Sequence, residues 1–121
     1  MKKIWIIGIA LIIIFIAGGL WYQSQPSQLD GFAKCLGEKG AKFYGAFWCP
    51  HCANQKKIFG RAAKYLPYTE CSSPDKQSQL QICNDAKVQG YPTWDFADGS
   101  RLSGEVPLKT LSEKTGCQLP Q

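Results

Sequence analysis

The stretch Phe47-Trp48-Cys49-Pro50-His51-Cys52 decides the fold, because it sets two thiols three positions apart between two regular segments. Residues 42–47 form an apolar run of strand length, and residues 53–64 have the composition of a helix. A strand that leads this motif into the first turn of a helix puts both sulfurs at a helix N-terminus. Unpaired N–H groups and the positive end of the helix dipole favour a thiolate there. Pro50 suits this first turn, because the N–H that it lacks would have had no partner inside the helix.

Residues 1–22 predict a single N-terminal transmembrane helix. Lys2 and Lys3 precede an uncharged, isoleucine-rich run over residues 4–22, which is close to the ~20 residues that cross a bilayer. Positive charges before this run and none just after it favour a domain outside the cytoplasm, in a periplasm, at the cell exterior or in a thylakoid lumen. The alternative is a signal peptide that is cleaved after the small residues Ala17-Gly18-Gly19, which would export the domain as well.

Beyond a polar linker over residues 23–28, residues 29–121 predict one small α/β domain. The expected elements are a helix over 29–39, a strand over 42–47, a helix from 53, a strand over 68–71, a helix over 76–86, a strand over 91–96, a return strand over 101–104 and a helix over 108–115. The aromatic residues expected in the core are Phe43, Phe47, Trp94 and Phe96. The net charge of +5 is mild, and its cations are scattered, so nucleic acid is not an expected partner.

Two cysteines at this spacing could also belong to a zinc site, a haem attachment site or a structural disulfide. Zinc is disfavoured because the chain has no second motif of this kind, and its only histidine, His51, lies inside the first. Haem attachment would need a histidine at position 53, which is Ala53. We therefore expect no metal and no cofactor, with a structural disulfide as the remaining alternative to a redox pair.

A second motif, Gly90-Tyr91-Pro92-Thr93, follows forty positions after Cys52 and opens a strand. With it, the chain resembles the thioredoxin superfamily, in which a Trp-Cys-x-x-Cys motif is followed by a cis-proline at a strand start. The resemblance implies a thioredoxin-like fold, a central mixed sheet flanked by helices, with a cis Tyr91–Pro92 bond beside the sulfurs. Only an X-Pro bond can be cis at small cost. The alternative is an ordinary trans proline at the start of an edge strand.

Residues 32–36, 44–52 and 89–94 are similar to a narrower group, the thioredoxin-like domain attached to bacterial and plant homologues of vitamin K epoxide reductase. This resemblance implies that the domain passes disulfides to the thiols of exported proteins, and that a quinone-linked membrane protein re-oxidises it. The sequence departs from the fused form, since it has one membrane segment and no multi-span unit. The resemblance therefore implies a free-standing domain. Phe43 stands where cytoplasmic thioredoxins usually carry a buried aspartate.

Positions within the predicted helix assign roles to the motif. Cys49 is expected to be the exposed, attacking thiolate, favoured by the helix end and by His51. Cys52, one turn further in, is expected to be the buried resolving thiol. The alternative for His51 is a solvated polar side chain with no effect on the sulfur. Trp48, Tyr91 and Thr93 are expected to line the surface that contacts the client protein.

Four further cysteines are expected to form structural disulfides, because an even number in an exported domain favours pairing. Three connectivities are possible. The short segment between Cys71 and Cys83 favours that pair, which leaves Cys35 with Cys117. The alternative is an electron relay, in which one of these pairs exchanges with Cys49–Cys52.

The sequence thus predicts a membrane-anchored thiol–disulfide oxidoreductase that oxidises exported proteins. A second hypothesis is a reductase of the same fold, for instance one that serves cytochrome maturation. A third is a non-catalytic module that holds partner proteins in the same cleft.

Overall fold

A four-stranded mixed sheet positions the two halves of the predicted site. In the computed structural model, which describes residues 1–121, the strands are β1 (Lys42–Gly45), β2 (Tyr68–Glu70), β3 (Thr93–Asp95) and β4 (Arg101–Ser103). β1 runs parallel to β2 and antiparallel to β3, and β4 forms a hairpin with β3. The strand order is β2-β1-β3-β4, so the strand that precedes Cys49 and the strand that follows Pro92 are neighbours.

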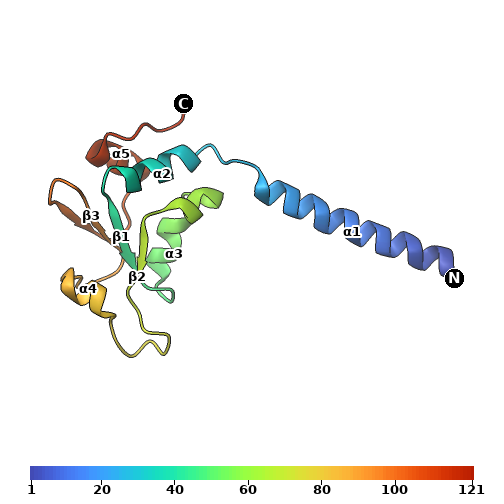
Figure 1. Ribbon diagram of the computed structural model, residues 1–121, viewed down its shortest axis with the longest axis horizontal. Helices are drawn as coiled ribbons and strands as arrows, with labels where there is room; N and C mark the ends of the chain where they lie inside the picture. The colour runs from blue at the N-terminus through green and yellow to red at the C-terminus, as the bar shows by residue number, and fades with distance from the viewer.

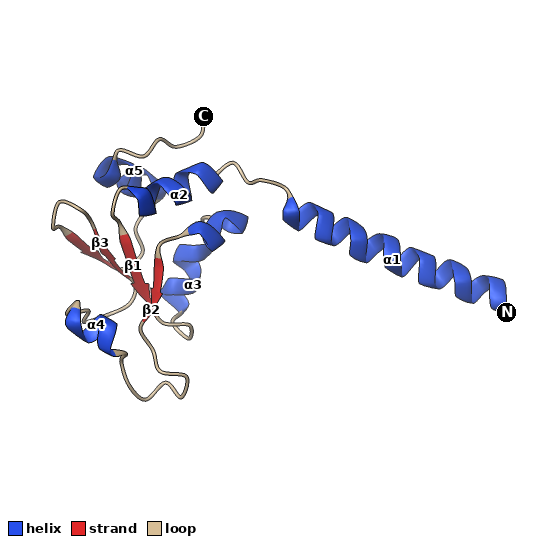
Figure 2. Cartoon of the chain, viewed as in Figure 1, coloured by secondary structure: helices blue, strands red, loops and turns tan.

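Helices flank this sheet on both sides. They are α2 (Asp30–Glu38), α3 (Pro50–Lys57), the 3-10 helix η1 (Gly60–Tyr65), α4 (Gln81–Asp85) and α5 (Leu108–Thr115). Figure 2 shows α3 on one side of the strands and α4 on the other, with α2 and α5 at the far end of the sheet. This arrangement confirms the predicted α/β, thioredoxin-like fold.

The two faces of β1 build two separate cores. Phe43 points into the larger one, where its ring stacks on Trp94 with centroids 4.7 Å apart. Tyr44 points to the opposite face, as strand alternation requires, and packs with Cys71, Cys83 and Val88. The larger core also receives side chains from α2, η1 and α5, among them Phe32, Leu36, Phe59, Ala62 and Leu111. Three of the four aromatic residues expected in the core, Phe43, Trp94 and Phe96, are buried there.

The predicted helix from residue 53 is broken in the structure. α3 ends at Lys57, and the chain resumes helical turns only in η1, of the tighter 3-10 type. Gly60 has a φ of +55°, which an L side chain rarely adopts, and so the α-helix cannot run straight through this position. The turn brings Phe59 and Ala62 into the larger core.

The predicted helix over 76–86 is also wrong in its first half, since α4 begins only at Gln81. Lys76 has a φ of +63°, and the Asp75 carboxylate accepts a 3.1 Å hydrogen bond from the backbone N–H of Gln77. This side-chain hydrogen bond offers the backbone an alternative to helix, as Asp commonly does. We call residues 72–80 the 72–80 loop, because it returns to β2 where Leu80 N–H donates to Cys71 O at 2.7 Å.

α1 (Lys2–Ser24) projects away from the domain (Figure 1). Its mean hydropathy is 2.6 and none of its residues is buried, so it is long and apolar enough to cross a membrane. This is compatible with either a membrane anchor or a signal sequence. Its C-terminal end meets the domain at Arg61, whose guanidinium donates hydrogen bonds to the carbonyls of Tyr22 and Gln25.

Two disulfides close the domain, in the pairs that the sequence favours. Cys35–Cys117 joins α2 to the residues after α5 across a separation of 82 positions. Cys71–Cys83 joins the end of β2 to α4 across a separation of 12 positions. The first therefore restrains nearly the whole domain, and the second restrains the 72–80 loop.

We expect the Cys35→Ala/Cys117→Ala variant to lose more stability than the Cys71→Ala/Cys83→Ala variant. Loop-closure entropy assigns about 4.5 kcal/mol to the long cross-link and about 3 kcal/mol to the short one. Urea unfolding followed by tryptophan fluorescence measures both values, because Trp94 is fully buried in the larger core. An equal or smaller loss in the first variant would contradict this ranking.

Candidate active site

The end of β1 delivers the Cys-Pro-His-Cys motif to the start of α3. β1 ends at Gly45, and the backbone N–H of Cys49 donates to the carbonyl of Ala46 at 3.1 Å to form a turn. Cys49 is the N-cap residue of α3 and Pro50 is its first residue, as the sequence predicts. Both sulfurs thus lie in the first turn of a helix, the environment that favours a thiolate.

Cys49 is less accessible than expected. It is only 7% exposed, so the prediction of an openly exposed thiol is wrong. The reason is the segment before β3: Tyr91 packs on the two active-site cysteines, and its carbonyl oxygen lies 3.7 Å from Cys49 Sγ. The Tyr91–Pro92 peptide bond is cis. The structure therefore brings the two sequence motifs together at Cys49 Sγ.

Cys52 is buried, with 1% of its surface exposed. Burial raises the pKa of its thiol from 9.0 to about 12, and the neighbouring Cys49 adds to this rise. A backbone hydrogen bond from Ala46 and the positive charge of Lys56 oppose it more weakly. At neutral pH, Cys52 is thus held as a thiol, the form required of a protected resolving group. Cys49 and Cys52 are the only cysteines outside the two disulfides.

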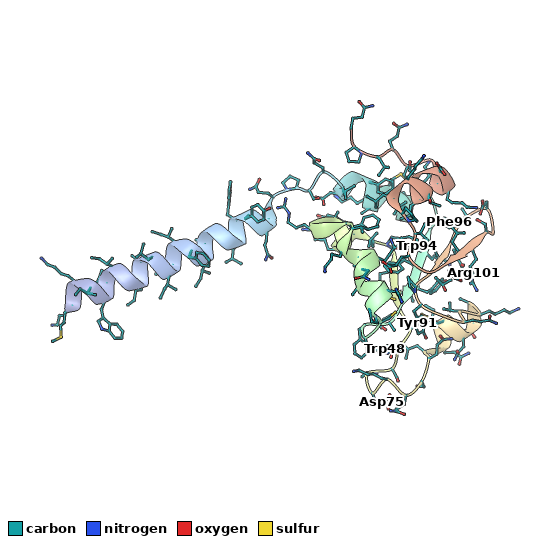
Figure 3. All side chains as sticks on the ribbon, turned by 180° about the vertical axis from the view of Figure 1, so that it is seen from behind. Trp48, Asp75, Tyr91, Trp94, Phe96 and Arg101 are labelled. Carbon is teal, nitrogen blue, oxygen red and sulfur yellow. A yellow bond between two sulfur atoms is a disulfide. The ribbon has the colours of Figure 1, made fainter.

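Aromatic side chains border the attacking sulfur. Trp48 is 46% exposed, and its ring meets Tyr91 edge-on with centroids 6.0 Å apart. Figure 3 shows both rings at the same end of the sheet, away from Trp94 and Phe96. Trp48 Nε1–H donates to Ser72 Oγ at 2.8 Å, and Tyr91 O–H donates to the side chain of Gln79. Both aromatic side chains are therefore held in place by hydrogen bonds to the 72–80 loop.

Two further expectations about this region are wrong. Phe47 is 54% exposed instead of buried, because β1 ends at Gly45 and the alternation of buried side chains stops there. Thr93 is buried and does not line a client surface. Its hydroxyl donates to the carbonyl of Gly90 at 2.7 Å, so it holds the turn that carries Tyr91 and Pro92.

His51 makes a side-chain contact with Glu105 that the sequence does not reveal. Its Nδ1 lies 2.8 Å from Glu105 Oε2, and its side chain is 68% exposed. Glu105 is held by the buried Gln55, which bonds both backbone groups of Val106, accepting from N–H at 2.6 Å and donating to the carbonyl at 3.0 Å. α3 thus supplies both His51 and Gln55, and Gln55 fixes the backbone next to Glu105, the acidic partner of His51.

Glu70, at the end of β2, is a second residue that the sequence does not mark. Its carboxylate accepts hydrogen bonds from Phe47 N–H at 3.1 Å, Ser72 N–H at 3.0 Å and Tyr68 O–H at 2.7 Å. It therefore joins the loop before Cys49 to the loop after β2. The only sequence signal for Glu70 is its place beside Cys71 at a strand end.

The four remaining cysteines are bonded to one another and not to the active-site pair. Cys71 and Cys83 are fully buried on the Tyr44 face, and Cys35–Cys117 joins α2 to the residues after α5, which lie at the other end of the sheet (Figure 1). The geometry gives no support to an electron relay. No group of three or more His, Cys, Asp or Glu side chains is placed to hold a metal ion.

Comparison with known proteins supports the assignment that this geometry suggests. The chain is 51% identical over 104 residues to thiol-disulfide oxidoreductase LTO1 of Arabidopsis thaliana, covering 82% of this chain and 27% of the relative. It is 37% identical over 92 residues to a thioredoxin domain-containing protein 5 homolog of Drosophila melanogaster, covering 68% of this chain and 22% of the relative. The domain belongs to the thioredoxin-like superfamily.

A third relative of this thioredoxin-like domain is protein disulfide-isomerase erp38 of Neurospora crassa. The two are 29% identical over 104 residues, covering 75% of this chain and 28% of the relative. The chain thus spans about a quarter of the length of each of these curated relatives. No family model matches the chain.

In the reduced thioredoxin-like domain, we expect the ¹³Cβ resonance of Cys52 to keep its thiol position through pH 10. It should move towards the thiolate position only near pH 12, where the pKa of this buried group lies. Since the folded thiol stays protonated where an unfolded one ionises, the reduced domain should also lose stability between pH 9 and pH 12. The oxidised domain serves as the control, because Cys52 does not titrate in it. Ionisation of Cys52 below pH 9 would contradict the effect of burial.

We expect His51→Ala to make the reduction potential of the Cys49–Cys52 pair more negative by tens of mV. A shift of ~30 mV corresponds to ~1.4 kcal/mol for this two-electron couple. The measurement is equilibration with glutathione buffers at pH 7. Glu105→Gln is the matched control, because it removes the negative charge of the partner and keeps the imidazole. An unchanged potential in His51→Ala would identify His51 as a solvated residue with no part in tuning the sulfur.

Proposed function

We propose that this chain is a thiol–disulfide oxidoreductase that exchanges the Cys49–Cys52 disulfide with thiols of exported proteins. The single observation that carries the proposal is the placement of Cys49 Sγ 3.7 Å from the Tyr91 carbonyl, with Cys52 buried behind it. Cys49 Sγ can then react with a docked client chain, while the buried Cys52 Sγ is not accessible to it. The names of the relatives from A. thaliana and N. crassa support disulfide exchange as the reaction.

In the oxidising direction, a client thiolate attacks Cys49 Sγ. The Cys49–Cys52 bond breaks, Cys52 takes up a proton, and a mixed disulfide joins the client to Cys49. A second client thiolate then attacks the client sulfur of this mixed disulfide, and Cys49 leaves as a thiolate. The client gains a disulfide and loses two electrons, which the cysteine pair of the domain now holds.

The surface around Cys49 suits an unfolded chain. The exposed Trp48 and the half-buried Tyr91 lie beside the sulfur, and aromatic contacts of this kind give area without much side-chain ordering. Because Pro92 has no N–H, the backbone next to it is free to pair with an extended client strand. The contact is therefore expected to depend on backbone and aromatic groups, which favours many clients over one.

The direction of transfer is proposed to be oxidation. The start of α3 stabilises the Cys49 thiolate, and a stabilised reduced form makes the pair a stronger oxidant. His51, paired with Glu105 beside the same helix end, is suited to add to this effect. The reductase of the same fold is the second candidate, and the buried Cys52 thiol is the observation that favours it, because a poor thiolate is a poor leaving group.

We further propose that α1 anchors the domain to a membrane and that the domain works on the outer side. Its length and hydropathy support an anchor, and the positive charges at Lys2 and Lys3 support an inner N-terminus. The re-oxidising partner is proposed to be a quinone-linked membrane protein of the vitamin K epoxide reductase type, to which the sequence motifs point. An anchored domain would meet such a partner in the plane of the membrane.

Trapping tests the exchange itself. We expect Cys52→Ala, incubated with scrambled ribonuclease as a disulfide-bearing client, to accumulate a mixed disulfide on Cys49 that is stable until reductant is added. The Cys49→Ala/Cys52→Ala variant is the control and should trap nothing. The wild-type potential then decides direction: a value near ~−120 to −180 mV supports the oxidant, and one near ~−270 mV favours the reductase. Absence of any mixed disulfide would leave only the partner-holding module.

A further inference from the structure

The sulfur of Cys52 is packed against a position where the chain has no side chain. A Cβ atom at position 45 would lie 2.9 Å from Cys52 Sγ and 2.8 Å from Cε2 of Tyr68, so only glycine fits. Cε2 is the ring carbon next to the one that bears the hydroxyl. Tyr68 on β2 and Cys52 on α3 therefore lie side by side over Gly45, beneath the active-site turn.

The hydroxyl of Tyr68 is hydrogen-bonded to the carboxylate of Glu70. Tyr68 O–H donates to Glu70 Oε2 at 2.7 Å, while the other oxygen of Glu70 holds the backbone N–H groups of Phe47 and Ser72. Burial raises the pKa of Tyr68 well above its usual value, and the hydrogen bond to Glu70 adds to the rise. Tyr68 is thus a neutral phenol that can accept one proton and give another, and Glu70 is the group that can store one.

The reaction needs a proton route at this point. Cys52 must lose its proton before it attacks a mixed disulfide on Cys49, and must regain it when it leaves in the opposite direction. Because burial raises the pKa of the Cys52 thiol to about 12, the thiolate of Cys52 is scarce at pH 7. Because Cys52 is buried, solvent bases have poor access to its proton. The strand position that could supply a carboxylate from β1 is Phe43, which faces the larger core.

We propose that Tyr68 and Glu70 form the proton route of Cys52, which rests on the proposed disulfide exchange. The Cys52 S–H proton passes to the Tyr68 oxygen as the Tyr68 O–H proton passes to the Glu70 carboxylate. The electron pair left on Cys52 forms the bond to Cys49 Sγ, the bond from Cys49 to the client sulfur breaks, and the client leaves as a thiolate. In the opposite direction, the same proton returns to Cys52 as its bond to Cys49 breaks. Tyr68 lies beside the Cys52 thiol over Gly45, and Glu70 acts through Tyr68 as a positioning and proton-storing residue.

The other charged and titratable groups near this route support the assignment. α3 contributes Cys49 and Lys56, whose ammonium lies 3.5 Å from the centroid of the Tyr68 ring. The positive charge of Lys56 favours negative charge on Cys52 while the proton is in transit. Tyr91 approaches from the segment before β3, and burial raises its pKa, so it stays a neutral phenol. His51 and Glu105 are paired with each other at the exposed helix end.

The test separates the resolving step from the first attack. The reduced full chain is mixed with oxidised glutathione, and acid-quenched samples are analysed by mass spectrometry for the Cys49–glutathione adduct and for its conversion to the Cys49–Cys52 disulfide. We expect Tyr68→Phe, which keeps the ring, to slow the conversion roughly 100-fold at pH 7. The deficit should shrink as pH rises, because hydroxide then replaces the internal base. Formation of the adduct by Cys49 should change far less.

Glu70→Gln should produce the same change in the pH profile, since the amide still accepts from Phe47 and Ser72 N–H groups but stores no proton at neutral pH. The double variant should be no slower than either single one, because both residues act in one route. Tyr65→Phe is the matched control, since Tyr65 lies on η1 and is not packed on either sulfur. Unchanged profiles in Tyr68→Phe and Glu70→Gln would overturn the route. If the wild type formed no adduct at all, the proposed function would fail instead, so the two failures are distinguishable.

Discussion

Close packing of the Cys52 sulfur against Gly45 is the constraint on which the site depends. It fixes how deep the second thiol of α3 sits below the surface, because any larger residue at position 45 would push the sulfur and the Tyr68 ring outward. Depth in turn sets the protonation of Cys52, since removal from water penalises the charged thiolate. The absence of a side chain at position 45 thus allows Cys52 to be buried one turn below Cys49, and burial keeps its thiol protonated.

The same packing explains why β2 matters as much as the helix that carries the cysteines. β2 pairs with β1 in parallel register, with Tyr68 opposite Phe43 and Glu70 opposite Gly45. This register places a hydroxyl and a carboxylate directly beside the active-site turn. Glu70 then ties that turn to the 72–80 loop through backbone N–H groups. Sheet pairing is therefore the means by which residues distant in the chain reach the dithiol.

Much of the fold was predictable because local signals agree with tertiary ones. The Cys-Pro-His-Cys motif between an apolar strand and a helix, and Pro92 before a second strand, were enough to place both halves of the site next to each other. The bounds of α5 follow from Pro107 and Gly116, which act at the two ends of that helix.

The helix break at Gly60 and the late start of α4 were missed, since both depend on backbone conformations with positive φ that composition does not fix. Glu105 and Gln55 were missed for a different reason: their partners lie more than 50 positions away, and no periodic pattern marks such a contact.

The Cys71–Cys83 cross-link has a consequence for the surface beside Cys49. It restrains the 72–80 loop, and that loop holds Trp48 through Ser72 and Tyr91 through Gln79. The positions of Trp48 and Tyr91 beside Cys49 are thus tied to a cross-link between two other cysteines. Oxidation of Cys71 and Cys83, two cysteines outside the Cys-Pro-His-Cys motif, therefore bears on the shape of the surface beside Cys49.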